Sequence, residues 1–396
     1  MIIGRSAYDT AAPGYYGVVR HGGLSALVRW GGGRVQPNRD RYFDGLRALA
    51  IIRVVLFHAF PFAWLELIFP SMGVMFALGG SLMVKSLDRD AVGAVRNRLR
   101  RLLPSLWAMG LILIPLMLHY GWPEHPSWPR LLLWIVPIAD PPSSEFGYSA
   151  AGVLWYLVTY LWLVLLSPLL LALYRRAHLA TVLVPLAGLV ALTMSPGVFG
   201  ETAGWVAQNV LAYASCWILG MAHREGDLAK LHPGVVIGLG ATCIGGALAW
   251  AWTHPIENHM DLTGFPVAYS VYAIGFVLVL MRWSPPMGWL ARVRPLDGFV
   301  SMVNNRAVTI YLWHNVAVTI AVYLFDPLQL WKIPTQGLEY LADFSIAMVL
   351  LAVAVLALGW VEDVAARRRP RISPFVKRVR LPPARPATTV SPAVLH

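Results

Sequence analysis

The stretch RYFDGLRALAIIRVVLFHAF, residues 41–60, is apolar enough to begin a membrane bundle, yet it contains Arg47 and His58. At 100° per residue, the step from Arg47 to His58 ends about 20° from the same helical face and about 16 Å further along the axis. Ionisable groups at such depth in a bilayer cost about 2.5–3.5 kcal/mol each and usually face an interior cavity. We therefore predict one functional stripe on this helix, formed by Arg47, Ile51, Val54 and His58.

A second interpretation of this pair is structural. Arg47 is then an interfacial anchor, and His58 is a core histidine that bonds to a neighbouring helix. In both interpretations we expect the His58 ring to be buried. Arg53 lies about 140° round the helix from His58, so we expect it to face another interface or the cavity wall.

The composition excludes an ordinary soluble domain, because 57% of the residues are hydrophobic, only 13% are charged and 17 are tryptophan. Apolar blocks long enough to cross a bilayer need about 20 residues each. We predict such blocks at 45–63, 71–86, 102–120, 151–173, 179–195, 204–222, 234–253, 264–282, 304–324 and 340–361. The predicted fold is therefore an all-α membrane protein with about ten transmembrane helices in a single bundle.

The distribution of basic residues predicts the orientation of this bundle. If both termini are cytosolic, all of the 32 Lys and Arg residues except Arg53, Arg130 and Lys332 fall on the cytosolic side. The net charge of +12 then reflects orientation and contact with anionic lipid, and no nucleic acid is expected as a partner. We expect a multi-pass protein of the cell (plasma) membrane. Its parts are a flexible cytosolic segment (1–38), a transmembrane domain (39–362) and a basic, proline-rich cytosolic tail (363–396).

A second basic motif, VRNRLRRLLPSLW at residues 95–107, precedes the third predicted span. Arg98, Arg100 and Arg101 stand before Pro104, which is tolerated in the first turn of a helix. A guanidinium cluster beside a helix N-terminus suits phosphate groups. The alternative is a stop-transfer cluster that holds the loop in the cytosol.

Two further groups of polar and aromatic side chains lie in predicted spans. Near the outer interface, where aromatic belts are common, we expect Trp155, Tyr156, Tyr160 and Trp162. His314 and Asn315, in the segment NNRAVTIYLWHNVAV that begins at residue 304, place polar atoms at membrane depth, where they need partners or water. A structural hydrogen bond and a role in a site are both open for them. The loop histidines at 119, 125, 254 and 259 have no ligand spacing, so no metal is expected.

Four motifs in order resemble the acyltransferase 3 family over about residues 40–362. They are the Asp-Gly-Leu-Arg run at 44–47 with the membrane His58, the Arg-rich segment 98–104 ending Arg-Leu-x-Pro, the Leu-Trp-Tyr-Leu run at 154–157 and the Tyr-Leu-x-His element at 311–314. Many members have Phe-Phe-x-x-Ser-Gly on the second span, whereas this chain has Gly79 in place of that serine. The absence of a hydroxyl there favours direct transfer over an acyl-enzyme. Arg53 is not part of the family pattern.

This resemblance implies a membrane-embedded O-acyltransferase that moves an acyl group, acetyl in the first instance, from acyl-CoA to a hydroxyl. The acceptor classes it implies are a cell-envelope glycan, a lipid-linked sugar or a secondary metabolite. On this basis we expect His58 and Arg47 to be catalytic, with His58 as general base, and Arg98, Arg100 and Arg101 to bind the phosphates of acyl-CoA.

The remaining contacts, to the acceptor or to a developing oxyanion, are assigned to Tyr156, Trp155, His314 and Asn315. The pantetheine arm is expected to run up the bundle interior from the arginines to His58. The partners are then the lipid bilayer, acyl-CoA and a hydroxyl-bearing acceptor. A multi-span transporter or flippase for a polar or acylated substrate is the alternative function, because intramembrane Arg and His residues also mark substrate pathways.

Overall fold

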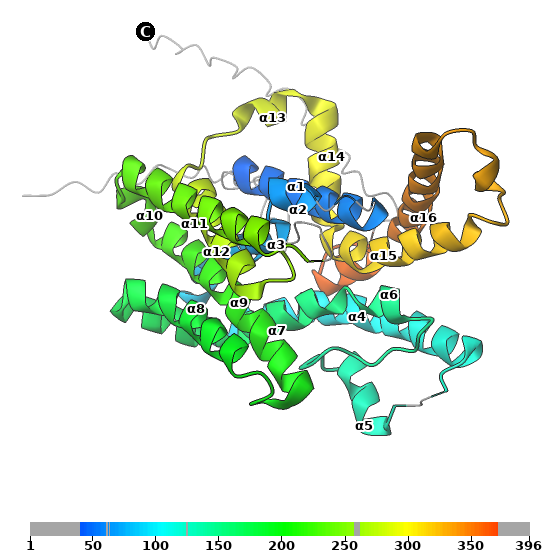
Figure 1. Cartoon of the computed structure of the whole chain (residues 1–396), viewed down its shortest axis with the longest axis horizontal. Helices are drawn as coiled ribbons and strands as arrows, with labels where there is room; N and C mark the ends of the chain where they lie inside the picture. Colours follow the sequence, from blue (N-terminus) through cyan, green and yellow to red (C-terminus); the bar gives the residue numbers. More distant parts are fainter. Residues whose placement is uncertain (1–39, 61, 63, 124–125, 257–261, 371–396) are drawn as a thin grey trace, which may run out of the picture. The chain divides into compact units, whose positions relative to one another are not determined.

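The computed structural model describes residues 40–370 except 61, 63, 124–125 and 257–261, and every element in these ranges is helical (Figure 1). The predicted N-terminal segment 1–38 lies outside the described residues, as does the tail beyond residue 370. The domain boundaries predicted at these two places stay predictions.

Ten helices of 17 residues or more lie within the described ranges, and each coincides with one predicted span. They are α1 (Arg41–Ala59), α3 (Ser71–Leu87), α4 (Ala91–Tyr120), α7 (Leu154–Arg176), α8 (His178–Met194), α9 (Gly200–Glu225), α11 (Pro233–Thr253), α12 (Pro266–Arg282), α15 (Ala307–Leu324) and α16 (Gln336–Ala365). Shorter helices between them are α2 (Trp64–Ile68), α5 (Trp128–Leu131), α6 (Tyr148–Ala151), α10 (Asp227–Lys230), α13 (Gly288–Arg292) and α14 (Arg294–Asn305), with 3-10 turns η1 (Leu132–Trp134) and η2 (Leu330–Lys332).

The protein is a membrane protein by the length and composition of its helices. Of the described helices, α4, α11, α15, α16 and the segment Tyr148–Arg176, which contains α6 and α7, are long and apolar enough to cross a bilayer. Three shorter helices, α3, α8 and α12, are also apolar. Large apolar side chains such as Leu111 (77% exposed) and Leu179 (70%) point outward, which is unfavourable in water and expected in lipid. The count of ten spans and the cytosolic location of the termini stay predictions.

The helix that contains the arginine motif begins earlier than its proline suggests. Asp90 caps α4, because its Oδ1 accepts a hydrogen bond of 2.9 Å from the backbone N–H of Gly93. Pro104 therefore lies inside α4, and the prediction that it stands in a first helical turn was wrong. Arg98, Arg100 and Arg101 are thus side chains in the interior of α4, beyond the free N–H groups of its first turn.

Close contact between α3 and α9 depends on glycine. A Cβ at Gly80 would lie 2.0 Å from the carbonyl oxygen of Trp217, and one at Gly220 would lie 1.9 Å from that of Ala77. Small residues let membrane helices approach in this way, so that packing replaces the missing hydrophobic drive between them. Helix α1 packs between α3, α14 and α15, and α15 lies beside α16 (Figure 1). This packing places the functional stripe of α1 inside the bundle.

Arg53 points to a different interface from Arg47 and His58, as predicted. Its Nε donates to the carbonyl oxygen of Leu65 at 3.0 Å, and its Nη2 lies 3.7 Å from Glu66 Oε1. The guanidinium also lies over the ring of Phe57, 4.9 Å from the centroid. Arg53 therefore attaches the short helix α2 to α1, and this ion pair accounts for a charge at membrane depth.

Candidate functional site

A cavity of about 460 Å³ lies where α1, α3, α4, α7, α15 and α16 meet, and we call it the arginine cavity. It is lined by Arg47, Met75, Gly79, Leu82, Arg98, Arg101, Leu102, Tyr156, Leu157, Tyr160, Asn304, Ala307, Val308, Tyr311, Glu362, Ala366 and Arg368. Its volume falls in the range of about 300–1,000 Å³ that is usual for small-molecule sites. The structure thus brings Arg47 of the first motif and two arginines of the second to one space.

The charges in the arginine cavity favour an anion. Arg47 and Arg101 form no hydrogen bond or ion pair with any described residue, and Arg98 donates only to the carbonyl oxygen of Leu82, at 3.4 Å. The lining carboxylate of Glu362 accepts a hydrogen bond of 3.1 Å from Thr309 Oγ1. Three arginines that form no hydrogen bond or ion pair with a carboxylate of the described chain suit groups with several negative oxygens.

The fourth arginine in the lining is already paired, since Arg368 Nη2 lies 3.1 Å from Asp363 Oδ1. Arg100 belongs to the same motif as Arg98 and Arg101 but is not among the lining residues. Sequence reasoning missed Glu362, although an acidic pair that ends a long apolar helix is a visible signal. It assigned Tyr160 only to the aromatic belt of the outer interface, because tyrosines near a membrane interface are common, whereas Tyr160 lines the arginine cavity.

The packing of α9 accounts for Gly79, the position at which this chain departs from the acyltransferase 3 pattern. A Cβ at this position would lie 2.6 Å from the indole ring of Trp217, so the close approach of α9 excludes a larger residue without a shift of that ring. Gly79 also lines the arginine cavity. The position therefore offers no hydroxyl as a nucleophile.

A much smaller space follows the arginine cavity towards the middle of the bundle. This inner gap has a volume of about 10 Å³ and is lined by Ala50, Ile51, Val54, Val55, Met72, Met75, Tyr156, Tyr311 and His314. Met75, Tyr156 and Tyr311 line both spaces and form the boundary between them. The gap has room for about one water molecule. The structure therefore shows two adjacent spaces, whereas we expected a continuous path from the arginines to His58.

Two histidines meet beyond the inner gap. His314 Nε2 lies 3.3 Å from His58 Nδ1, and the two rings are nearly perpendicular, at 77°, with centroids 4.8 Å apart. His58 Nδ1 also lies 2.9 Å from the carbonyl oxygen of Val54, and His314 Nδ1 lies 2.6 Å from that of Tyr311. Residues from α1 and α15, 256 positions apart in the chain, thus form one histidine pair.

The hydrogen bonds of this pair assign its protons. A carbonyl oxygen only accepts, so His314 Nδ1 carries a proton for Tyr311 and its Nε2 is left as an acceptor. His58 Nδ1 likewise carries a proton, which it shares between Val54 and His314. A neutral imidazole has only one N–H, so His58 Nε2 holds a lone pair. The pair is therefore arranged so that the outer nitrogen of His58 accepts a proton.

The prediction that His58 is buried was wrong. His58 lies in the last turn of α1 and is exposed, whereas His314 is fully buried. His58 Nε2 forms no hydrogen bond with a described residue. Because the ring of His314 on α15 packs against one side of the His58 ring, the exposure is on the other side.

The remaining predicted residues have different surroundings. Trp155 stacks on Tyr213, with centroids 5.6 Å apart, and does not line the arginine cavity. Asn315 Nδ2 donates to the carbonyl oxygen of Ser149 and so ties α15 to α6. Tyr156 is buried and lines both spaces. The described residues contain no cluster of three metal-ligating side chains; His125 and His259 lie outside them.

Comparison with known proteins adds one match. Residues 40–361 match a family model described as an acyltransferase domain, of the type called acyltransferase 3. No curated protein and no solved structure matches the chain. The match covers all ten long helices but the end of α16.

Proposed function

The chain belongs to the acyltransferase 3 family, and on that premise we propose that it transfers an acetyl group from acetyl-CoA to a hydroxyl of a cell-envelope glycan, a lipid-linked sugar or a secondary metabolite. The transfer takes place in the plasma membrane. The observation that carries the proposal is that three arginines with no ion pair in the described chain line a cavity that shares Met75, Tyr156 and Tyr311 with the gap that His314 lines. This arrangement supports phosphate binding at the arginines and proton acceptance at the histidine pair, of which His314 lines the inner gap.

The arginine cavity is proposed to receive the donor from the cytosol. Its guanidinium groups bind phosphate oxygens through charge-assisted, bidentate hydrogen bonds, which lysine does not reproduce. Arg98 and Arg101 lie on α4, and Arg47 lies further in on α1. We assign the phosphates of coenzyme A to these arginines. The cavity volume of 460 Å³ holds part of the molecule, and the rest extends beyond it.

His58 does not line the inner gap, so the thioester is proposed to pass through the gap towards His58 by displacing the side chains of Met75, Tyr156 and Tyr311. Methionine is unbranched and flexible, so it adapts to an occupant more readily than a branched side chain does. The boundary excludes water from the thioester while the gap is closed. Tyr156 offers its hydroxyl as a donor to the oxyanion, because it lines both spaces and the N–H of His314 already bonds to a carbonyl oxygen.

The transfer step follows from the proton arrangement of the histidine pair. His58 Nε2 accepts the proton of the acceptor hydroxyl while the hydroxyl oxygen forms a bond to the thioester carbonyl carbon. The carbon–sulfur bond then breaks, and the thiolate of coenzyme A leaves and takes up the proton that His58 holds. No acyl-enzyme is needed, which agrees with a glycine at position 79.

The direct test uses purified protein, acetyl-CoA labelled in its acetyl group, and extracted envelope glycans and lipid-linked sugars. We expect label to move to one of these fractions and free coenzyme A to form in equal amount. Absence of labelled product with every hydroxyl-bearing fraction, in a preparation that still binds acetyl-CoA, contradicts acyl transfer.

The double substitution Arg98→Gln with Arg101→Gln tests the donor site. Hydrogen bonds to charged groups contribute about 1.5–3 kcal/mol, so we expect the Kd of acetyl-CoA to rise at least about tenfold. The dependence of this Kd on salt concentration should also become weaker, because salt screens the arginine–phosphate attraction. Titration calorimetry at several salt concentrations measures both. Arg96→Gln is the matched control, since Arg96 is exposed on the same helix and does not line the cavity. An unchanged Kd in the double variant leaves the two arginines only a topological role.

The small volume of the inner gap predicts a preference for acetyl over longer acyl groups. Met75→Ala is expected to improve butyryl-CoA relative to acetyl-CoA, because one methylene in an apolar pocket is worth about 1–3 kcal/mol. Competition between the two donors, read as the ratio of products, measures this preference. Met75→Leu conserves the volume and should keep the ratio of the unaltered protein. If Met75→Ala leaves the product ratio unchanged, the acyl group does not contact Met75 at the inner gap.

A further inference from the structure

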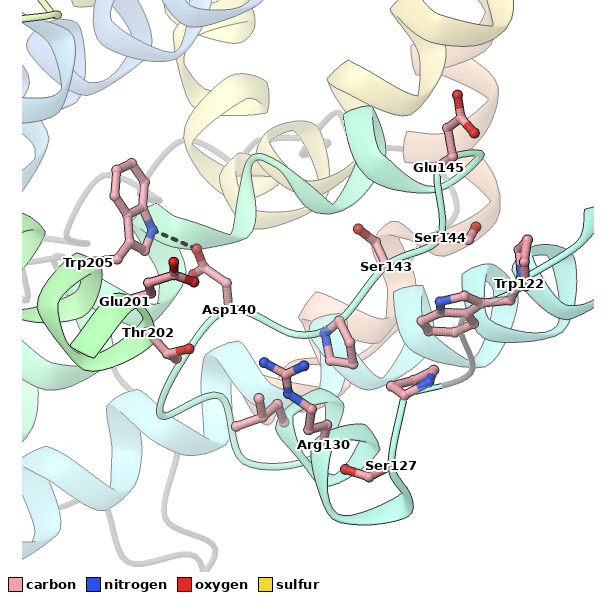
Figure 2. A pocket seen from close by; sticks show the side chains of 14 residues that line it. Trp122, Ser127, Arg130, Asp140, Ser143, Ser144, Glu145, Glu201, Thr202 and Trp205 are labelled. Atoms are coloured by element: carbon pink, nitrogen blue, oxygen red, sulfur yellow. Dashed lines mark hydrogen bonds between the residues drawn. The ribbon is translucent and has the colours of Figure 1, made fainter. Parts of the chain in front are cut away.

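A second and larger cavity, which we call the loop cavity, is formed by residues 122–123 and 126–145, between α4 and α6, together with the start of α9 (Figure 2). Its volume is about 1020 Å³, and none of its lining residues belongs to the arginine cavity. The lining consists of Trp122, Pro123, Pro126, Ser127, Arg130, Leu133, Asp140, Pro142, Ser143, Ser144, Glu145, Glu201, Thr202 and Trp205. Nothing in the acyl-transfer site described above uses these residues.

Four indole N–H groups hold the wall of this cavity in place. Trp107 donates to the carbonyl oxygen of Ile135 at 2.9 Å, and Trp162 donates to that of Ile138 at 2.9 Å. Trp134 donates to Pro142 at 3.0 Å, and Trp205 donates to Asp140 Oδ2 at 2.8 Å. The segment from 135 to 142 is therefore attached to α4, α7 and α9 as well as to η1. A preformed wall binds a ligand without the cost of ordering a loop.

The two tryptophans in the lining mark the two ends of the cavity. Figure 2 shows Trp205 with Glu201 and Asp140 at one end, and Trp122 near Ser144 at the other. Trp205 is 47% exposed, although its indole N–H is already bonded. An aromatic face held in this way offers apolar area to the C–H face of a flat, polar ligand.

The charged groups of the loop cavity are mostly carboxylates. Three carboxylates, Asp140, Glu145 and Glu201, share the lining with a single arginine, Arg130, and none of the four forms an ion pair with a described residue. Glu201 is four positions before Trp205 on α9, so both side chains project on the face that meets Asp140.

One carboxylate oxygen of Asp140 has no hydrogen-bond partner in the described chain. Its Oδ2 accepts from Trp205, whereas its Oδ1 is buried and has no hydrogen-bond partner in the described chain. Burial raises the pKa of Asp140, and the bond from Trp205 counteracts part of this rise. A carboxylate oxygen only accepts hydrogen bonds, so a ligand that satisfies Oδ1 must bring an O–H or N–H donor.

The loop cavity is connected to the histidine pair by a short stretch of chain. The lining segment that ends at Glu145 continues into α6, where the carbonyl oxygen of Ser149 accepts the hydrogen bond from Asn315 Nδ2. Asn315 is the neighbour of His314 in α15. The chain that lines the loop cavity is therefore attached, through α6, to the helix that carries the buried histidine.

We propose that the loop cavity binds a polyhydroxylated ligand without anionic groups, that is, a neutral or amine-bearing sugar. Hydroxyl or ammonium donors of the sugar pair with Asp140 and Glu201, and a ring face packs on Trp205. Excess carboxylates repel sugars that carry carboxylate or phosphate groups. That this bound sugar is the acyl acceptor rests on the function proposed above.

Binding is tested on the purified full chain in lipid nanodiscs, without acyl-CoA. The probes are N-acetylglucosamine trisaccharide (neutral), glucosamine trisaccharide (amine-bearing) and galacturonic acid trisaccharide (anionic). We expect saturable binding of the first two and at least tenfold weaker binding of the third, measured by calorimetry or saturation-transfer NMR. Equal or tighter binding of the anionic probe, or no binding of the other two at millimolar concentration, overturns the proposal.

Two substitutions locate the bound sugar. Trp205→Ala is expected to raise the Kd of both bound probes at least tenfold, whereas Trp128→Ala should not, because Trp128 lies in the same loop, is 84% exposed and does not line the cavity. Asp140→Asn preserves the shape and should weaken the amine-bearing probe more than the neutral one. Equal effects of Trp205→Ala and Trp128→Ala contradict the assigned site.

The two proposals fail in different ways. If Trp205→Ala weakens sugar binding but no acyl transfer to the sugar is observed, the loop cavity is a sugar site and the sugar is not the acyl acceptor. If acyl transfer to a glycan occurs and the KM of the glycan is unchanged in both Trp205→Ala and Asp140→Asn, the proposed function stands. In that case the loop cavity does not bind the sugar.

Discussion

Replacing His58 with alanine is expected to lower acyl transfer about 10²–10⁴-fold, the usual contribution of a general base. The physical reason is the free lone pair on His58 Nε2, which the bonds of Nδ1 to Val54 and His314 leave as the proton acceptor. The ring is exposed on the side away from His314, so its removal leaves no internal cavity there. The variant should therefore still accumulate in the membrane.

The measurement is the rate of coenzyme A release with labelled acetyl-CoA and a competent acceptor, at matched amounts of purified protein. His119→Ala serves as the control, because His119 is exposed at the end of α4 and lies outside both interior spaces. The Kd of acetyl-CoA should be the same in both variants, since His58 does not line the arginine cavity. Normal turnover by the His58→Ala protein ends the general-base assignment.

The second large effect is expected at His314, which we treat as a positioning residue. His314→Phe removes the acceptor that orients the N–H of His58, and the loss of such an orienting partner typically costs about 10–100-fold. We expect this loss in kcat, with the KM for acetyl-CoA nearly unchanged. His314→Gln retains a side-chain oxygen that accepts from His58 Nδ1 and should recover part of the rate.

A purely structural role for His314 predicts another result. Because His314 is fully buried, its replacement also changes packing, and the thermal stability of each variant must be measured beside its rate. If His314→Phe and His314→Gln lose activity in proportion to their loss of stability, with no recovery by glutamine, His314 only fills space. A raised Kd for acetyl-CoA in either variant points to damage that extends to the arginine cavity.

Local periodicity made a large part of this protein readable from its sequence. The ten predicted blocks coincide with ten long helices, because apolar length is a property of a segment on its own. The face of α1 that turns inward was also predicted correctly. Arg47 lines the arginine cavity, and Ile51 and Val54 line the inner gap. His58 contacts His314, which lines the same gap. Helical geometry determines this order before any neighbour is present.

Contacts between helices could not be read in the same way. Nothing in the spacing of α15 indicates that His314 meets His58, because the two residues are 256 positions apart and their contact depends on how α1 and α15 pack. The exposure of His58 and the distance of Trp155 from the arginine cavity have the same origin. The start of α4 at Ala91 was missed because a proline was taken to mark the first turn, while the cap at Asp90 determines where the helix begins.

The amino-acid sequence alone thus determined that the chain forms membrane helices, which faces of them carry charge, and which family the motifs belong to. Only the tertiary structure decided which arginines share a cavity and which nitrogen of His58 holds a lone pair. It also showed that a loop held by hydrogen bonds from four indole N–H groups forms a second cavity. The reason is that helix formation and membrane burial depend on neighbours a few residues away. A binding site depends on atoms that only the close packing of distant helices brings within hydrogen-bond reach.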